Sequence, residues 1–207
     1  MLFAVVFSLG ILKGQGPAYV NLGKEALVET DIYSIGQDEQ GLIWLTTDKG
    51  LLRYDGYEFA PIPTGDPGSR SLFGLTNGKQ GELYCFDLGG KIYRIVGDTA
   101  SLYYQIPDSV LINQLSISVA PDSSLWVSCR QVLRIRDGQA EIWEGDPLSS
   151  LGRSLQWDNQ GNLYLPGADA ALYRIRGTEV QARFQLPDAD TSEQVVQSEL
   201  YRLQDQL

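Results

Sequence analysis

The sequence contains a fourfold repeat of about 40 residues, and this feature restricts the possible folds most strongly. In each copy an aromatic residue follows a Gly or Ser by three positions, and these aromatics are Trp44, Tyr84, Trp126 and Tyr164. Eight to ten residues later an arginine lies between apolar or aromatic neighbours, at Arg53, Arg94, Arg134 and Arg174. Because both features recur in the same order, we expect four similar structural units.

Each unit has the pattern of short β-strands. Segments such as 32–35, 43–46 and 51–54 are rich in β-branched and aromatic residues. Turn residues separate them, for example at 38–41, 55–56, 77–78, 137–138 and 158–161. Four such strands form one antiparallel sheet with two apolar faces, which must pack against neighbouring sheets. The sequence therefore predicts an all-β fold, a β-propeller of four-stranded blades. A linear β-solenoid usually has shorter repeats, and a β-sandwich would not explain the recurring motif.

The repeat period divides the chain into segments. We expect a lead-in or closing strand at 15–31 and blades at 32–71, 72–111, 112–151 and 152–190. Residues 191–207 are expected to begin a fifth blade, because Leu200 follows Ile32 by 168 residues, or four units of 42, in a similar local sequence. A helix over 192–207 is the alternative, because this segment is rich in Gln, Glu and Leu and has a possible N-cap. The predicted architecture is thus a partial, open propeller.

The N-terminus indicates export. Residues 2–12 are apolar and uncharged, which is too short for the roughly 20 residues of a membrane span but suits a signal peptide. We predict a signal peptide over 1–14 and a periplasmic or other extracytoplasmic location. No Lys or Arg precedes Lys13, so a start codon further upstream is a second possibility. A buried first strand is the alternative interpretation of this apolar segment.

The charged residues exclude several classes of function. With 16 Lys and Arg against 26 Asp and Glu, the net charge is −10, which opposes binding to nucleic acid or to anionic lipid. The 207 residues include no histidine, so they hold no Ser-His-Asp or Cys-His catalytic group, no histidine-ligated zinc and no phospho-accepting histidine. We therefore expect no enzymatic activity and no cofactor in these residues.

The repeated residues have structural and functional interpretations. The four aromatics could stack on a sugar, but their equivalent positions favour packing between blades. The four arginines could bind an anion together, but their apolar neighbours favour stems that lie across a sheet with hydrated or paired heads. The turns at Asp38 and Asp158 lack the alternating acidic ligands of a calcium loop and are predicted to be ordinary aspartate turns. We assign no catalytic, cofactor, metal or ligand-binding residue.

The two cysteines, Cys85 and Cys129, are expected to be buried and unbridged. They follow their units' aromatics by one and three residues, so they lie on the same face of equivalent strands. In neighbouring blades they would point the same way around the ring, which disfavours a disulfide.

The first unit resembles a known family. The segment from Gln37 to Phe59 is similar to the two-component regulator propeller repeat, found in the extracytoplasmic half of hybrid sensor histidine kinases of Bacteroidetes-type bacteria. Residues 26–35 also resemble the lead-in to the first blade of that family. The later units have Tyr84 and Tyr164 in place of Trp, have no counterpart of Thr47 and lose the Tyr-Asp-Gly run. The matching residues of the first unit are Asp38, Gly41, Trp44, Thr47, Asp48, Gly50, Leu51, Arg53, Tyr54, Asp55, Gly56 and Phe59.

The resemblance implies a sensing module without catalytic activity, with loops at one end of the blades that bind an oligosaccharide or another small extracellular ligand. In such proteins tandem seven-bladed propellers precede a membrane helix and a cytoplasmic kinase, and the full-length parent would be a homodimer. Four blades are too few for that ring, so we expect an N-terminal fragment or a truncated gene product, whose parent reaches the membrane only through missing C-terminal regions. The alternatives are a carbohydrate-active propeller enzyme, given an Asp38-x-x-Gly41-x-x-Trp44 pattern similar to an Asp-box, and a structural or adhesive propeller domain.

Overall fold

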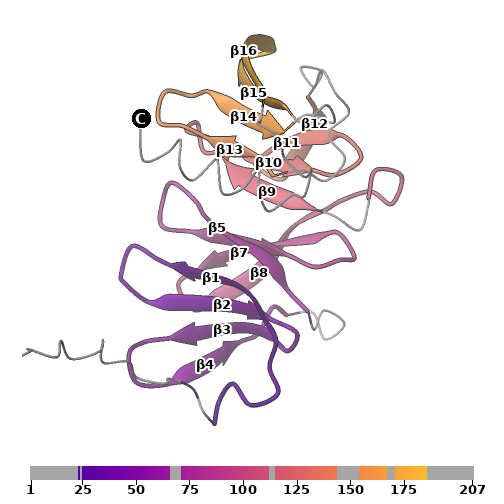
Figure 1. The fold of residues 1–207 in the computed structure, drawn as a ribbon. Coiled ribbons are helices and arrows are strands. Elements are labelled where there is room, and N and C mark those ends of the chain that lie inside the picture. Colours follow the sequence, from indigo (N-terminus) through magenta and orange to yellow (C-terminus); the bar gives the residue numbers. More distant parts are fainter. Residues whose placement is uncertain are drawn as a thin grey trace, which may run out of the picture.

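The fold is described from a computed structural model, in residues 23, 25–65, 71–111, 115–143, 154–166 and 171–185. These residues form 16 strands and no helix. The strands make four separate four-stranded antiparallel sheets that follow one another along the chain (Figure 1). The predicted fold, a partial and open β-propeller, is thus confirmed. Within these residues, no helix has the length and apolar character that a membrane crossing requires.

Each sheet is one blade, with its strands in chain order. Blade 1 consists of β1 (Ile32–Gln37), β2 (Ile43–Thr47), β3 (Gly50–Tyr54) and β4 (Phe59–Ile62). Blade 2 consists of β5 (Phe73–Asn77), β6 (Leu83–Phe86), β7 (Lys91–Val96) and β8 (Thr99–Gln105). Blade 3 consists of β9 (Ser116–Val119), β10 (Leu125–Ser128), β11 (Val132–Arg136) and β12 (Gln139–Ile142). Blade 4 consists of β13 (Gln156–Trp157), β14 (Leu163–Pro166), β15 (Ala171–Arg176) and β16 (Glu179–Gln185).

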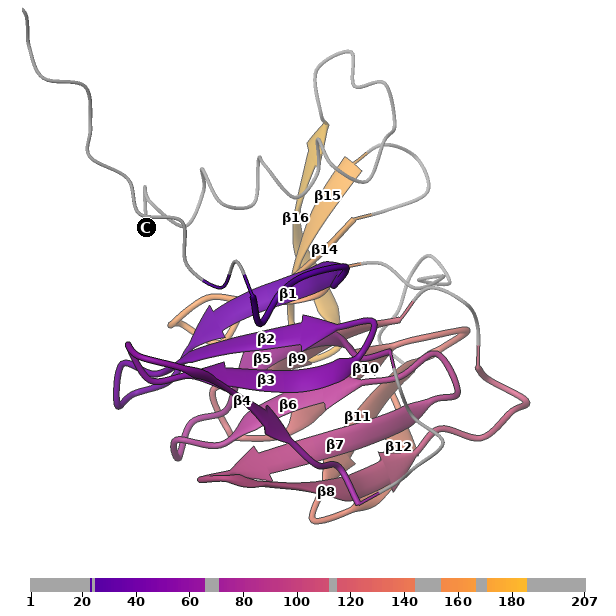
Figure 2. The same cartoon turned by 90° about the horizontal axis from the view of Figure 1, so that it is seen from below.

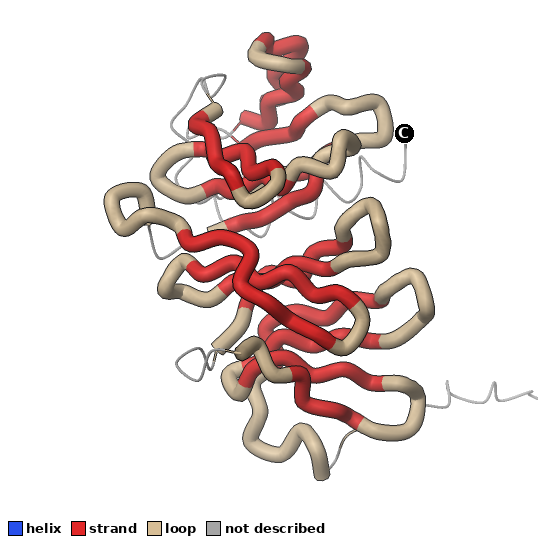
Figure 3. Tube along the Cα trace, turned by 180° about the vertical axis from the view of Figure 1, so that it is seen from behind, coloured by secondary structure: helices blue, strands red, loops and turns tan. Residues whose placement is uncertain are grey.

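The first strands of the blades form the inner edge of the assembly. Strand β1 contacts β5, β5 contacts β9, and β9 contacts β13. Hydrogen bonds join the first two of these strands: the Ser34 hydroxyl accepts the Gly74 N–H at 3.1 Å, and the Asn77 side-chain amide donates to the Gln37 carbonyl at 2.9 Å. Seen from behind and from below, the strands of each blade lie side by side and the blades are stacked (Figures 2 and 3).

The two repeated sequence features are cross-strand neighbours. In each blade the aromatic on the second strand lies opposite the arginine on the third. Residues directly opposite in an antiparallel pair project from the same face of the sheet. The two features therefore form one structural unit, and hairpins of different length account for their variable spacing. The four pairs are Trp44–Arg53, Tyr84–Arg94, Trp126–Arg134 and Tyr164–Arg174.

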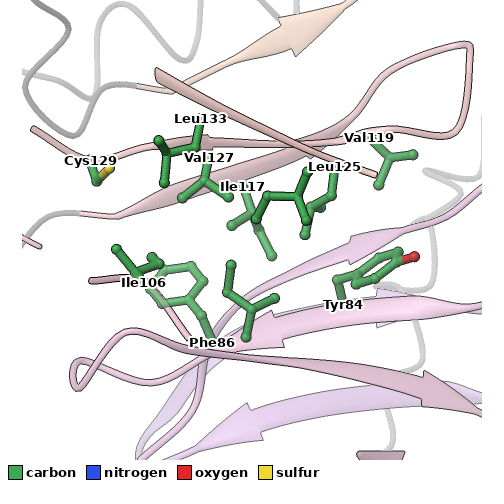
Figure 4. Close-up of a cluster of buried hydrophobic side chains, with 11 residues drawn as sticks. Tyr84, Phe86, Ile106, Ile117, Val119, Leu125, Val127, Cys129 and Leu133 are labelled. Carbon is green, nitrogen blue, oxygen red and sulfur yellow. The ribbon is translucent and has the colours of Figure 1, made fainter. Parts of the chain in front are cut away.

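The hydrophobic cores lie between the blades rather than within them. Figure 4 shows the core between blades 2 and 3, where Tyr84 and Phe86 from β6 face Val127 and Leu133 from β10 and β11. The core between blades 1 and 2 packs Trp44 and the core between blades 3 and 4 packs Trp126 in the equivalent way. Because side chains alternate along a strand, the aromatic faces the following blade and its next neighbour faces the preceding blade.

The predicted packing role of the aromatics is confirmed. The exposed fractions of Trp44, Tyr84, Trp126 and Tyr164 are 2%, 3%, 6% and 6%. The first three lie in the cores between blades. Side chains this deeply buried present no face on which a sugar could stack.

The prediction for the cysteines is also confirmed. Cys85 and Cys129 are both buried free thiols. Cys85 belongs to the core between blades 1 and 2, and Cys129 belongs to the core between blades 2 and 3. Each therefore points toward the blade that precedes its own, and the two thiols lie in separate cores.

The residues before β1 return to blade 1. The lead-in turn, residues 25–31, is tied to the β2–β3 hairpin: the Lys49 ammonium donates to the Val28 carbonyl at 2.9 Å, and the Asp31 N–H donates to an Asp48 carboxylate oxygen at 2.9 Å. The predicted signal peptide (1–14), the rest of the lead-in apart from residue 23, and the predicted fifth blade or helix (191–207) lie outside the described residues.

The cores between blades predict a strong difference between two leucines. Leu125 is 1% exposed in the core between blades 2 and 3, whereas Leu102 on β8 is 55% exposed. We expect Leu125→Ala to lower the free energy of unfolding by about 2–5 kcal/mol, because it leaves a cavity between two sheets. Leu102→Ala is the matched control and should change it by less than about 0.5 kcal/mol. Urea denaturation followed by circular dichroism measures both, and equal effects would contradict the assignment of this core.

Candidate functional site

A carboxylate lies beside the repeated aromatic at one end of each blade, where the first strand turns into the second. In blade 1, one carboxylate oxygen of Asp38 accepts the Trp44 indole N–H at 2.8 Å. The other oxygen accepts the backbone N–H groups of Gln40 and Leu42, both at 2.9 Å. Asp38 thus closes the turn and also provides a partner for the polar end of a buried indole.

Blade 4 has the same arrangement around Asp158. One oxygen accepts the backbone N–H groups of Gln160 and Asn162 at 2.9 and 2.8 Å, and the other accepts the Asn162 side-chain amide at 2.7 Å. Partial burial raises the pKa of Asp158, but these hydrogen bonds outweigh it and lower the pKa below its usual value. The prediction of ordinary aspartate turns at Asp38 and Asp158 is therefore confirmed. Among the described residues, no group of three or more metal-ligating side chains occurs.

Blade 2 supplies its carboxylate from a different position. Gly78 occupies the position six residues before the aromatic, where blades 1 and 4 have aspartate. A Cβ atom at Gly78 would lie only 2.2 Å from the carboxyl carbon of Glu82. Glu82 instead accepts the Gln80 N–H at 2.9 Å and the Tyr84 hydroxyl at 3.4 Å. The Glu82 carboxylate thus fills the space of the missing aspartate, an exchange that position-by-position comparison of the repeats did not reveal.

Blade 3 uses a relay of two side chains. The Trp126 indole N–H donates to the Ser124 hydroxyl at 2.9 Å, and this hydroxyl donates to Asp122 at 2.5 Å. Asp122 also pairs with Arg134 at 2.7 Å and with Arg136 at 2.6 Å. Partial burial raises the pKa of Asp122, but the hydrogen bonds from Ser124 and Arg134 outweigh it and hold the pKa at about 2.

The arginines lie on the third strands and therefore away from the inner edge of the assembly. Arg134 pairs with Asp122 within its blade and also with Glu141 at 3.0 Å. Arg53 of blade 1 forms an ion pair with Asp98, in the β7–β8 turn of blade 2. The predicted stem across a sheet with a paired head is thus observed for both. The Nε atoms of Arg53 and Arg94 are buried without a hydrogen-bond partner.

A cleft of about 570 Å³ lies between blades 1 and 2 at this end. Its lining includes Trp44, which is only 2% exposed, together with residues of the first turns of both blades and of the β7–β8 turn. The lining contains both hydrogen-bond donors and carboxylate acceptors, so it suits a ligand that can both accept and donate hydrogen bonds. The charged groups of the lining are Asp38, Glu39, Arg53, Glu82, Arg94 and Asp98.

Burial and the neighbouring carboxylate both affect the ionisation of Tyr84. Burial first, and the negative charge of Glu82 second, raise the pKa of Tyr84 to about 12. The phenol is therefore neutral at physiological pH. It acts as a hydrogen-bond donor to Glu82 rather than as an ionised nucleophile.

No family model matches the chain, and no curated protein matches it. Solved structures with the same fold do match. A virginiamycin B lyase from Staphylococcus aureus has a TM-score of 0.62 and 20% sequence identity, with 82% of this chain and 59% of that chain covered. The extracellular domain assigned to a hybrid two-component system of B. thetaiotaomicron (BT3049) has a TM-score of 0.55 and 17% identity, with 76% of this chain and 25% of that chain covered.

A third solved structure is a gluconolactonase from Xanthomonas campestris, with a TM-score of 0.55, 16% identity, and 75% of this chain and 62% of that chain covered. The present chain spans less than two thirds of each of these three proteins. At such low sequence identity the similarities show the propeller fold, which enzymes and sensor domains share.

Substitutions at Gly78 and Glu82 test whether the Glu82 carboxylate replaces the aspartate found in the turns of blades 1 and 4. Glu82→Leu should lower the free energy of unfolding by about 1–3 kcal/mol, because the Gln80 N–H and the Tyr84 hydroxyl lose their acceptor. Gly78→Asp alone should also destabilise, because its side chain collides with Glu82. The double variant Gly78→Asp, Glu82→Leu reproduces the pattern of blade 1 and should recover most of the loss. Urea denaturation of the three variants measures this coupling, and additive losses would contradict it.

The depressed pKa of Asp122 predicts a pH-dependent contribution to stability. Because the folded-state pKa is about 2 and the unfolded value is about 3.9, the stabilisation is fully present above about pH 5 and is mostly lost by about pH 2. The difference in unfolding free energy between the wild type and Asp122→Asn should therefore shrink between pH 4 and pH 2. Denaturation curves at pH 6, 4, 3 and 2 measure it, with exposed Asp108→Asn as the control.

Proposed function

We propose that this chain is part of an extracytoplasmic, ligand-sensing β-propeller of a two-component sensor. The observation that carries the proposal is the similarity of residues 37–59 to the two-component regulator propeller repeat. The shared fold with extracellular domains of hybrid two-component systems supports it. In this proposal residues 1–14 direct export, and the membrane helix, kinase and dimerisation regions belong to a longer parent protein.

The cleft between blades 1 and 2 is the proposed ligand site. Its lining carries both guanidinium donors and carboxylate acceptors, which suits the hydroxyl groups of an oligosaccharide or a similar small polar ligand. Two blades contribute to it, and the Arg53–Asp98 ion pair joins them. A ligand that binds one spacing of the two blades better than another would shift their relative position. Such a shift is the proposed signal passed along the stacked blades.

An enzyme of the lyase or lactonase type is the second candidate, favoured by the similarity to those two propellers. A variant of the virginiamycin B lyase in which alanine replaces a histidine is catalytically inactive. The 207 residues here contain no histidine that could take that place. The proposed role of these residues is therefore binding without catalysis.

Ligand binding at the cleft is testable by thermal shift. A panel of neutral oligosaccharides should include members that raise the melting temperature of the 207-residue chain in a concentration-dependent way. Glu39→Ala, in the lining, should weaken that binding at least about fivefold, a loss typical of one charge-assisted hydrogen bond. Glu58→Ala, in the exposed β3–β4 turn, is the matched control and should bind like the wild type. Equal effects of both substitutions would contradict the site.

The gene provides a separate test of the sensor assignment. If the reading frame continues past Leu207 into further repeats, a membrane helix and a histidine-bearing transmitter, the sensor assignment holds. A frame that continues into a glycosidase domain would contradict it. Incubating the chain with the panel and analysing the products by mass spectrometry distinguishes binding from turnover.

A further inference from the structure

The repeated arginine of blade 3, Arg134, has an acceptor for each of its three nitrogens. Its Nε donates to the Ser124 hydroxyl at 3.4 Å, and its two terminal nitrogens pair with Asp122 at 2.7 Å and with Glu141 at 3.0 Å. All three acceptors belong to the same blade. The guanidinium of blade 3 is therefore held by its own sheet.

Blade 1 keeps the arginine but lacks these acceptors. The turn hydrogen bonds and the strand register place Leu42, Gln40 and Ala60 at the three acceptor positions. The first and the third are apolar, and the second carries no charge. The Nε atom of Arg53 is accordingly buried without a hydrogen-bond partner. Blade 1 thus holds a charged donor without the acceptors that blade 3 provides.

The direction of the side chains separates the two arginines that line the cleft between blades 1 and 2. Arg53 lies opposite Trp44 and so projects from the face of blade 1 that packs on blade 2. Arg94 lies opposite Tyr84 and so projects from the face of blade 2 that packs on blade 3. Arg53 is therefore the guanidinium that the strand register directs between blades 1 and 2.

Asp98 is the partner that Arg53 has across this cleft. It lies in the β7–β8 turn of blade 2 and pairs with a terminal nitrogen of the guanidinium. The Asp98 side chain is 68% exposed, whereas that of Arg53 is 19% exposed. An ion pair with so exposed a partner contributes little to stability. A group that offers a better set of acceptors can therefore displace Asp98.

We propose that the ligand of this cleft carries a carboxylate group, which binds Arg53 in place of Asp98. The inference rests on the proposed ligand site and specifies its chemistry. The two oxygens of a carboxylate match two neighbouring N–H donors of a guanidinium, so one group can meet both Nε and a terminal nitrogen. Because Nε is shielded from solvent, the guanidinium has to turn away from Asp98 to make this contact.

The other charges around the cleft leave this role to Arg53. The carboxylates of Asp38 and Glu82 are already hydrogen-bonded within their own turns. The net charge of −10 opposes an anion at long range, so a short-range contact has to supply the preference. Acidic sugars and simple organic acids both offer the required group.

Isothermal titration calorimetry of the full chain tests the carboxylate. The probes are oligosaccharides of galacturonic and glucuronic acid, each compared with its methyl ester, which has the same sugar without the charge. We expect an acid to bind at least about tenfold more tightly than its ester, the gain typical of charge-assisted hydrogen bonds. Citrate distinguishes the two sources: if it binds as tightly as the best oligosaccharide, the group belongs to a simple organic acid. Equal binding of every acid and its ester would overturn the proposal.

Substitutions of Arg53 test the donor. Arg53→Gln should abolish the preference for the acid over the ester. Arg53→Lys keeps the charge but not the planar pair of donors, and should reduce the preference at least about threefold. Arg176→Gln removes an exposed arginine of β15 and is the matched control, with an unchanged preference. An Arg53→Gln variant that still prefers the acid would overturn the role of this residue.

Substitution of Asp98 tests the displacement. Asp98→Asn removes the competing carboxylate, so it should tighten binding of the acid about two- to fivefold and leave binding of the ester unchanged. Asp137→Asn, in the corresponding turn of blade 3, is the matched control and should change neither. Weaker binding of the acid by Asp98→Asn would show that the ligand does not replace this group.

These measurements also separate the inference from the ligand site on which it rests. If an ester or a neutral sugar binds, and Glu39→Ala weakens it, but the acid has no advantage, the site holds and the carboxylate is wrong. If no acidic or neutral probe binds, the proposed ligand site fails and the inference fails with it.

Discussion

The packing of one blade's central aromatic against the next blade is the interaction on which the structure depends. Each sheet has two apolar faces and cannot bury both on its own. Trp44, Tyr84 and Trp126 each fill one such gap. An aromatic side chain buries a large apolar area, so one residue in each blade contributes much of the contact with the next. In blades 1 and 2 a carboxylate at the turn accepts a hydrogen bond from the polar end of the ring, and in blade 3 the Ser124 hydroxyl links the ring to Asp122.

The sequence predicted the fold because the repeat has a strong physical cause. A residue that must fill the same gap in every blade recurs at the same spacing, and Trp44 and Tyr84 are recognisable for that reason. The pairing of Trp44 with Arg53 across a hairpin was less evident, because the number of residues between them varies from blade to blade. The number of residues between the two positions depends on the length of the hairpin, whereas the register of the paired strands determines which side chains lie opposite each other.

The candidate site was less predictable than the fold. The cleft between blades 1 and 2 depends on how two sheets approach each other, and the Arg53–Asp98 pair joins residues that have different positions in their respective repeats. A comparison of equivalent positions is not sensitive to such a contact. Charge alone also gives little guidance, because acidic residues are spread along the whole chain.

The Gly78–Glu82 exchange in blade 2 has a consequence for recognising repeats of this kind. The two positions are coupled: a carboxylate occupies one only when the other leaves it space. A profile that scores each column separately counts this blade as two mismatches, although the hydrogen-bonding chemistry of the turn is intact. Sequence searches for divergent propeller blades should therefore score these two positions together rather than separately. Grafting a blade from one array into another would require the turn to be moved as a complete block.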